Sequence, residues 1–351
     1  MHYDEYVLEL EDGTQFAGTP IGNWRKASGE VVFNTSMCGY QEILTDPSYA
    51  GQLIVMTYPL IGNYGTTSSA MESDGIYAAG LVVSECCAAP SHWQREETLH
   101  GYLLGHGIPG LAGVDTRALT RHLRKMGTMK GHFQGQGILL ADPDFGGRNY
   151  DISGEAFHVP GSGTWRVAVV DYGVKHNIIR SLSAMGADVY VFPGDSEASE
   201  VLSVAPDGVV LSNGPGDPSS YTGSLECIRQ LAFSKPTMGI CLGHQLLGMA
   251  FGAETYKLKY GHRGGNHPVK DLRTGRVAIT AQNHGYALRD KISEDLRITH
   301  INLNDASVEG IAHKHLPAFS VQFHPEAFPG PEDSNYLFTN FRAMVQAASH
   351  A

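Results

Sequence analysis

Apolar and polar residues alternate in short segments along the first third of the chain, which is the pattern of half-buried β-strands. Two such segments flank a turn at Asp12-Gly13 and predict a β-hairpin. The predicted strands of this part lie at 6–10, 15–17, 30–34, 52–58 and 80–83. A β-rich scaffold is therefore expected here.

Two other segments of this part, 99–104 and 115–126, have apolar residues at helical spacing instead. Asp115 can cap the first turn of the second helix. The residues expected on its buried face are Leu119, Leu123 and Met126.

The segment 39–49 is rich in turn formers and aromatic residues and is predicted to be a loop on the β scaffold. It could carry binding residues or be a rigid surface connection. The segment 105–110 fits the pattern G-x-G-x-x-G, but it follows no clear strand and Pro109 interrupts it. We therefore do not interpret it as a dinucleotide site.

The last part of the chain alternates buried strands with helices, which is the rhythm of a parallel sheet covered on both faces. The predicted strands are 166–172, 188–192, 208–211, 237–240 and 318–323. The predicted helices are 177–185 and 225–233. Ligands of such sheets gather at the carboxyl ends of the strands.

Periodicity fades between residues 141 and 165, where Pro and Gly residues are frequent. We interpret this segment as a linker between an N-terminal domain (1–140) and a C-terminal domain (166–348). Two domains also agree with a length of 351 residues. The predicted fold class is α/β.

The net charge, the apolar runs and the cysteines of the chain exclude some classes of partner and compartment. The formal net charge is −11, which argues against a nucleic-acid or anionic-membrane partner. We find no run of apolar residues long enough to span a membrane and no signal peptide. The five cysteines are irregularly spaced, so we expect a protein of a reducing compartment, the cytoplasm.

Candidate chemistry begins at Cys241, which lies between Gly239 and Gly243 where a predicted strand meets a helix. This is the thiol form of a nucleophile elbow, whose sharp turn leaves no room for flanking side chains. A helix N-terminus also favours a thiolate. The alternative is a buried cysteine beside a helix.

A catalytic thiol needs a base, and the base needs an orienting group. His324 and Glu326 follow the strand at 318–323 and share one face of an extended backbone. We predict that His324 takes the thiol proton and Glu326 fixes its tautomer. The alternative is a strand-end histidine capped by a nearby acid.

Other residues could complete a pocket for a small amide substrate. Gly214 and Gly216 can bring backbone N–H groups to a developing oxyanion, together with the N–H of Leu242. Gln245 and Asn283 offer amides, with local capping as the alternative. His262, His267 and His284 lack metal-ligand spacing, so no metal is predicted.

Three motifs in this order resemble a class I (triad-type) glutamine amidotransferase domain. They are Asn-Gly-Pro-Gly-Asp-Pro at 213–218, Gly-Ile-Cys-Leu-Gly-His-Gln at 239–245 and Gln-Phe-His-Pro-Glu at 322–326. The segments 10–14, 29–37, 39–49, 115–117, 261–269 and 283–285 resemble the small subunit of carbamoyl-phosphate synthetase. The resemblance covers nearly the whole chain.

The resemblance implies a heterodimer in which this chain hydrolyses L-glutamine and passes ammonia to a large synthetase subunit, with higher oligomers possible. That partner would make carbamoyl phosphate from bicarbonate, using ATP and a divalent metal, for arginine or pyrimidine synthesis. No cofactor is implied in this chain. The implied catalytic residues are Cys241, His324 and Glu326. The residues implied to hold glutamine are Ser48, Gly214, Gly216, Leu242, Gln245, Asn283, Gly285 and Tyr286.

Two departures from the family pattern stand out. The linker is short, and Tyr286 occupies a position where phenylalanine is frequent, so its hydroxyl could change the pocket wall. Three alternatives stay open: an amidotransferase that feeds another synthetase, a thiol peptidase or other cysteine hydrolase, and a regulatory subunit with a relic triad.

Overall fold

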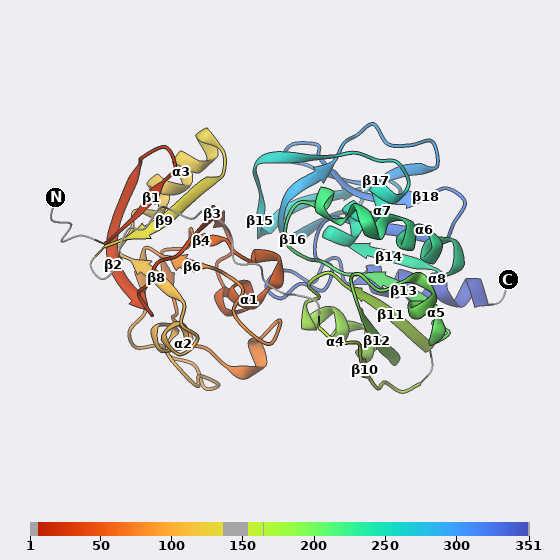
Figure 1. The fold of residues 1–351 in the computed structure, drawn as a ribbon, viewed down its shortest axis with the longest axis horizontal. Helices are drawn as coiled ribbons and strands as arrows, with labels where there is room; N and C mark the ends of the chain where they lie inside the picture. Colours follow the sequence, from red (N-terminus) through yellow and green to blue (C-terminus); the bar gives the residue numbers. More distant parts are fainter. Residues whose placement is uncertain (1–5, 136–153, 164, 350–351) are drawn as a thin grey trace. The chain divides into compact units, whose positions relative to one another are not determined.

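The structure is a computed structural model that describes residues 6–135, 154–163 and 165–349. The chain forms two compact units, Met1–Tyr150 and Asp151–Ala351. The first runs from red to yellow and the second from green to blue in Figure 1. Among the described residues, no helix has the length and apolar character needed to cross a membrane.

A closed barrel forms the centre of the first unit, with the strand order β1-β2-β8-β6-β4-β3-β9 and β9 paired back to β1. The predicted hairpin is confirmed, because β1 and β2 pair antiparallel across the turn. The barrel strands are β1 (Tyr6–Leu10), β2 (Gln15–Gly22), β3 (Ser28–Asn34), β4 (Leu53–Met56), β6 (Gly80–Val82), β8 (Pro109–Ala112) and β9 (Met129–Gln134). A small separate pair is formed by β5 (Leu60–Ile61) and β7 (Glu85–Cys86).

Both helices predicted in this unit are present, as α2 (Leu99–Gly105) and α3 (Thr116–Met126). Asp115 caps α3 by accepting a hydrogen bond from the Ala118 N–H. Leu119 and Leu123 are buried, but the prediction for Met126 was wrong, since this last residue of the helix is exposed. In a dinucleotide-binding turn a strand leads into a helix, whereas the segment 105–110 leads from the helix α2 into the strand β8.

The segment 39–49 differs from its prediction as a loop. It forms the helix α1 (Tyr40–Thr45) and the 3-10 helix η1 (Pro47–Tyr49), and most of its side chains are buried. A second 3-10 helix, η2 (Ser68–Ala70), follows. The glycine and the aspartate that indicated a loop instead precede and cap these short helices: Gly39 is the N-cap of α1 with a φ of 83°, and the Asp46 side chain accepts from the Ser48 N–H.

A ten-stranded sheet forms the second unit, in the order β10-β12-β11-β13-β14-β19-β18-β17-β15-β16. Its parallel centre was predicted and is confirmed. The strands of this centre are β11 (Trp165–Asp171), β12 (Ala187–Pro193), β13 (Gly208–Leu211), β14 (Thr237–Ile240) and β19 (Ala318–Val321).

Antiparallel strands extend this centre on both sides, and the sequence pattern did not predict them. They are β10 (Phe157–Val159), β15 (Thr255–Asp271), β16 (Val277–Leu288), β17 (Leu296–Asn302) and β18 (Val308–His313). The strand β10 lies inside the predicted linker and pairs with β12, so this part of the linker belongs to the sheet. Residues 141–153 of the predicted linker lie outside the described residues.

Helices cover both faces of the sheet, as a doubly covered parallel sheet requires. Successive residues of β11 alternate between two cores: Val167 and Val169 pack with α4 and α8, and Ala168 and Val170 pack with α5, α6 and α7. The helices are α4 (His176–Ala184), α5 (Ala198–Ser203), α6 (Leu225–Ser234), α7 (Leu242–Ala250) and α8 (Tyr336–Ser349), with the 3-10 helix η3 (Pro218–Ser224). One core contains Met238 and Ile240 of β14, and the other contains Leu242 of α7, so the turn between β14 and α7 joins the two cores.

Candidate active site

Cys241 stands at the sharp turn between β14 and α7. Its φ of 54° and ψ of −104° are unusual for a residue with a side chain. Such strain costs on the order of 1–3 kcal/mol and is concentrated at functional sites. The flanking glycines are required by close approach: a Cβ on Gly239 would lie 2.6 Å from Gly243 O, and one on Gly243 would lie 2.2 Å from Leu211 O.

His324 and Glu326 lie just beyond the end of β19, and both are buried. The backbone N–H of His324 donates to Ala281 O at 2.9 Å, which fixes the turn against β16. His324 Nδ1 and Glu326 Oε1 are 2.7 Å apart. Since a carboxylate only accepts, Nδ1 carries the proton and Nε2 is left for another partner.

The environment changes the pKa of both groups. Burial alone would lower the pKa of His324, but the adjacent Glu326 carboxylate and the Cys241 thiol raise it above its ordinary value. Burial would raise the pKa of Glu326, but Lys175 and His324 lower it below its ordinary value. The charged forms of the imidazole and the carboxylate therefore stabilise each other.

Lys175 is a buried residue of this site that sequence reasoning missed. Its Nζ donates to Glu326 Oε1 at 3.1 Å and to Ala327 O at 2.6 Å. The neighbouring Asn177 donates to the backbone oxygen of Glu326. Lys175 follows β11, so its place after a strand of the parallel centre, at the same edge as Cys241, was the available signal.

Gln322 is a second residue that the prediction did not include. Its Nε2 lies 3.8 Å from Cys241 Sγ, within reach of a weak hydrogen bond to sulfur. Its Oε1 accepts from Gln245 Nε2 at 3.0 Å. Because Gln245 Nε2 also donates to Tyr286 O at 2.8 Å, both of its amide protons are paired within the protein. A contact from Gln245 to glutamine would have to come from its Oε1.

The remaining predicted residues of this unit lie on two segments. Gly214 approaches another backbone closely, since a Cβ there would lie 2.2 Å from Tyr172 O, and Gly216 has a φ of +90°. Leu242 begins α7, so its N–H has no acceptor within the helix. This leaves a donor beside the thiol.

Asn283, Gly285 and Tyr286 all belong to β16. The backbone oxygen of Asn283 accepts from Cys241 Sγ at 3.5 Å, which places this strand at the thiol. The hydroxyl of Tyr286, which departs from the family pattern, bonds to the Asp217 carboxylate. It therefore joins β16 to the segment that contains Gly214 and Gly216.

Ser48 belongs to the first unit, in η1, where its N–H donates to Asp46 Oδ1 at 2.9 Å. The contacts described for the second unit do not test its predicted part in glutamine binding.

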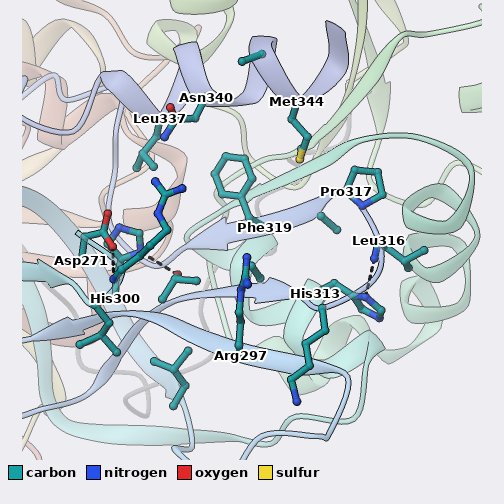
Figure 2. Close-up of a pocket in the computed structure, with 18 of the residues that line it drawn as sticks. Asp271, Arg297, His300, His313, Leu316, Pro317, Phe319, Leu337, Asn340 and Met344 are labelled. Atoms are coloured by element: carbon teal, nitrogen blue, oxygen red, sulfur yellow. Dashed lines mark hydrogen bonds between the residues drawn. The ribbon is translucent and has the colours of Figure 1, made fainter. Parts of the chain in front are cut away.

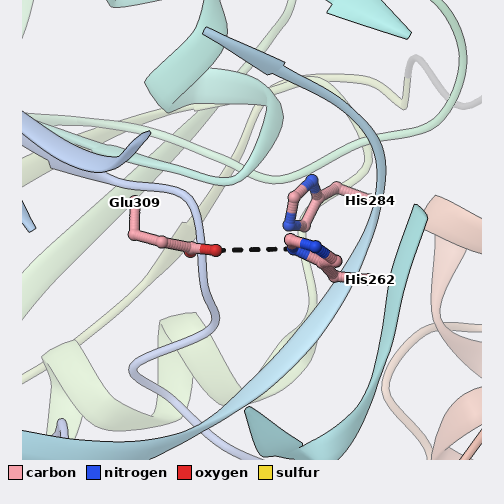
Figure 3. Close-up of side chains that lie close together, drawn as sticks. All are labelled: His262, His284 and Glu309. Atoms are coloured by element: carbon pink, nitrogen blue, oxygen red, sulfur yellow. Dashed lines mark ion pairs between the residues drawn. The ribbon is translucent and has the colours of Figure 1, made fainter. Parts of the chain in front are cut away.

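Three histidines, His262, His267 and His284, lack metal-ligand spacing in the sequence, but the sheet pairs His262 with His284. His262 on β15 pairs directly with His284 on β16, and Glu309 on β18 lies beside them (Figure 3). Their possible ligand atoms all lie within 4.8 Å of one another. Sequence spacing could not indicate this, because cross-strand register created the cluster.

A groove of about 840 Å³ lies on another part of the second unit, between α8 and the strands β17 to β19 (Figure 2). Arg273, Arg297, Lys314, Phe319 and Met344 are among its lining residues. None of the predicted catalytic or glutamine-binding residues lines it.

Comparison with known proteins defines the class of the second unit first. Residues 168–344 match the family model "Glutamine amidotransferase class-I", so this unit is a class I amidotransferase domain. Residues 8–133 match the "Carbamoyl-phosphate synthase small chain, CPSase domain". The chain belongs to the carbamoyl phosphate synthase small chain family. This confirms the predicted enzyme, a glutamine-hydrolysing carbamoyl-phosphate synthase small subunit, and its fold class.

Curated relatives match along their whole length. The carbamoyl phosphate synthase small chain of Symbiobacterium thermophilum is 50% identical, covering 97% of this chain and 98% of the relative. That of Listeria monocytogenes is 51% identical, with 97% and 96% covered. The pyrimidine-specific small chain of Halalkalibacterium halodurans is 49% identical, with 98% of each chain covered.

Proposed function

We propose that this chain hydrolyses glutamine through a cysteine thioester on Cys241 and delivers the ammonia to a large synthetase subunit. The observation that carries the proposal is the buried series Cys241, His324, Glu326 and Lys175. In this series a strained thiol lies beside an imidazole whose other nitrogen is held by a carboxylate. This is the arrangement that nucleophilic catalysis by a thiol requires.

The first half of the reaction forms the thioester. His324 takes the thiol proton, and the Cys241 sulfur attacks the side-chain amide carbon of glutamine. The N–H groups of Leu242 and Gly214 hold the oxyanion, a contribution of about 2.7–4 kcal/mol per donor in other acyl-transfer sites. The C–N bond then breaks, and His324 gives its proton to the departing nitrogen, which leaves as ammonia.

The second half regenerates the enzyme. His324 removes a proton from water, the hydroxide attacks the thioester carbon, and the S–C bond breaks to release glutamate. Glu326 keeps the imidazole in the required tautomer, and Lys175 keeps Glu326 ionised. Proton transfer of this kind contributes about 10²–10⁴-fold in rate.

Ammonia that escapes to neutral water is largely protonated and no longer a nucleophile, so a protected path to the partner is needed. We propose that the partner, a large subunit using ATP and a divalent metal, docks with the help of the N-terminal domain (1–140). Glutamine hydrolysis should then rise when the partner and its substrates are added.

The test is one assay of both nitrogen sources on the complex, with wild-type chain and with Cys241→Ala. We expect the variant to make carbamoyl phosphate from ammonium salts at the wild-type rate but to lose synthesis from glutamine. Normal assembly, checked by gel filtration, is the control. If the assembled variant also loses ammonia-dependent synthesis, Cys241 is not confined to amide hydrolysis and the proposal is wrong.

A further inference from the structure

A buried cluster of His262, His284 and Glu309 takes no part in the chemistry proposed above. The three residues come from three strands, β15, β16 and β18, and all are almost completely enclosed (Figure 3). The rings of His262 and His284 are 4.9 Å apart and nearly perpendicular. Two imidazoles and a carboxylate are the donor set that zinc and similar divalent ions prefer.

The outer nitrogen of each ring is held by an oxygen acceptor. His262 Nε2 lies 2.9 Å from Asp305 Oδ2, and His284 Nδ1 lies 2.7 Å from Tyr286 O. A backbone oxygen only accepts, so His284 Nδ1 carries the proton of a neutral ring and leaves a lone pair on Nε2. His262 pairs with Asp305 through Nε2 and with Glu309 through Nδ1, so an ion bound here would take the place of the Nδ1 proton. Metal-binding histidines are oriented by this kind of outer hydrogen bond.

The two carboxylate oxygens of Glu309 differ in their partners. Glu309 Oε1 accepts from Asn302 Nδ2 at 2.9 Å. Within the described parts of the chain, however, the buried Glu309 Oε2 has no hydrogen-bond partner, and His262 Nδ1 approaches Glu309 Oε1 only at the longer distance of an ion pair, 3.5 Å. Buried polar atoms are nearly always paired, so the unpaired Glu309 Oε2 indicates a place for a further positive partner.

Gln282 adds another acceptor to the same cluster, because its Oε1 lies 2.8 Å from His284 Nε2. The orientation of this amide is fixed by Thr280, whose hydroxyl donates to His267 O at 2.9 Å and so can only accept from Gln282 Nε2 at 3.2 Å. Two lone pairs therefore face each other between Gln282 and His284. A cation placed beside them would remove this repulsion.

We propose that His262 Nδ1, His284 Nε2 and the Glu309 carboxylate bind a structural divalent ion of the zinc type, with Gln282 Oε1 or water as the fourth ligand. His262 Nδ1 and Glu309 Oε1 are 3.5 Å apart, close to the roughly 3.4 Å edge of a tetrahedral zinc site. The two carboxylates of Glu309 and Asp305 would balance the charge of the ion.

Such an ion would cross-link β15, β16 and β18, and so stabilise the part of the sheet next to the thiol. The backbone of Glu309 already accepts from the Gln322 N–H at 2.9 Å, and His284 stands between Asn283 and Gly285 on β16. This inference revises the expectation of no metal. It does not depend on the proposed reaction, because its test measures metal binding.

The test begins with the full chain, stripped by a chelator and dialysed against low-micromolar Zn²⁺. We expect one tightly bound ion per chain and a higher Tm than for the stripped chain. Loading with Co²⁺ should give the visible bands of a tetrahedral ion without the thiolate-to-cobalt band in the near ultraviolet. That spectrum distinguishes the cluster from metal bound by Cys241 or another cysteine.

Variants locate the site. His262→Asn and Glu309→Gln should each bind the ion at least about tenfold more weakly, and Asp305→Asn, which only orients His262, should bind it about 10–100-fold more weakly. His300→Asn is the matched control, since His300 is also a buried histidine with an unpartnered nitrogen but lies outside the cluster. Absence of a stoichiometric ion in the wild type, or a thiolate band in its cobalt spectrum, would overturn the proposal. The negative charge of Glu309 would then be balanced by protons and not by a metal ion.

Discussion

Lys175 balances the charge of a carboxylate that is fully enclosed. Removing one partner of a buried ion pair leaves an uncompensated charge and costs about 3–5 kcal/mol. We therefore predict that Lys175→Met lowers the free energy of unfolding by this amount, measured by urea denaturation. Lys175→Met combined with Glu326→Gln should recover part of the loss, because the buried carboxylate that Lys175 balances is then absent. Equal losses in the single and double variants would show that packing, and not charge, is the cause.

The pair also makes stability depend on pH. The pKa of Glu326 is lowered from 4.5 to about 2: burial raises it, but Lys175 and His324 more than reverse that effect. Ionised Glu326 therefore contributes stability above about pH 4.5 and loses it as the pH falls towards 2. We predict that the difference in unfolding free energy between the wild type and Glu326→Gln shrinks across this range in urea titrations. A difference that stays constant there would contradict the assignment.

Among the elements, α7 packs closely against the end of β13. A Cβ on Gly243 would lie 2.2 Å from Leu211 O, which is backbone and cannot move aside easily. We predict that Gly243→Ala lowers the unfolding free energy by about 1–3 kcal/mol, as overpacking does. It should also reduce glutamine hydrolysis, because the elbow must shift.

The matched control is Gly105→Ala at the end of α2, where a Cβ would meet nothing within 4 Å. Alanine there should leave stability unchanged or raise it slightly, since it favours helix. Similar losses for both glycines, measured by thermal unfolding, would mean that loss of glycine itself is the cause.

Elements with strong local patterns could be predicted from the sequence, and those set by tertiary pairing could not. The run from Val167 to Val170 and the turn around Cys241 have patterns that few folds accept, and both were found. The helix α1 was missed because six residues are too few for a helical period to emerge. The long strands β15 and β16 were missed because glycine and histidine residues interrupt their alternation.

In the candidate site, too, residues within local motifs could be predicted and residues brought together by tertiary pairing could not. Cys241, His324 and Glu326 lie within motifs, so their juxtaposition could be anticipated. Lys175 lies 151 positions from Glu326, and the pairing of His262 with His284 depends on strand register. Only the folded chain brings these residues together.

At the scale of the whole molecule, the proposed role of Ser48 connects the first unit to the reaction. If its hydroxyl binds glutamine, Ser48→Ala should raise KM about 2–10-fold, the effect of one neutral hydrogen bond, and change kcat less. Steady-state kinetics of the complex would measure this split. Ser73→Ala is the control, because the Ser73 hydroxyl bonds to backbone oxygens of its own unit and should affect stability only. An unchanged KM for Ser48→Ala would make η1 purely structural.

The barrel of the first unit has a topological consequence. Because β9 pairs with both β1 and β3, every barrel strand has two neighbours, and no row of unpaired backbone groups is left for an incoming strand. A protein that binds this barrel cannot do so by extending its sheet, and must recognise side chains and connecting segments instead. Specificity for the partner would then depend on surface residues that can change between species while the barrel backbone stays the same.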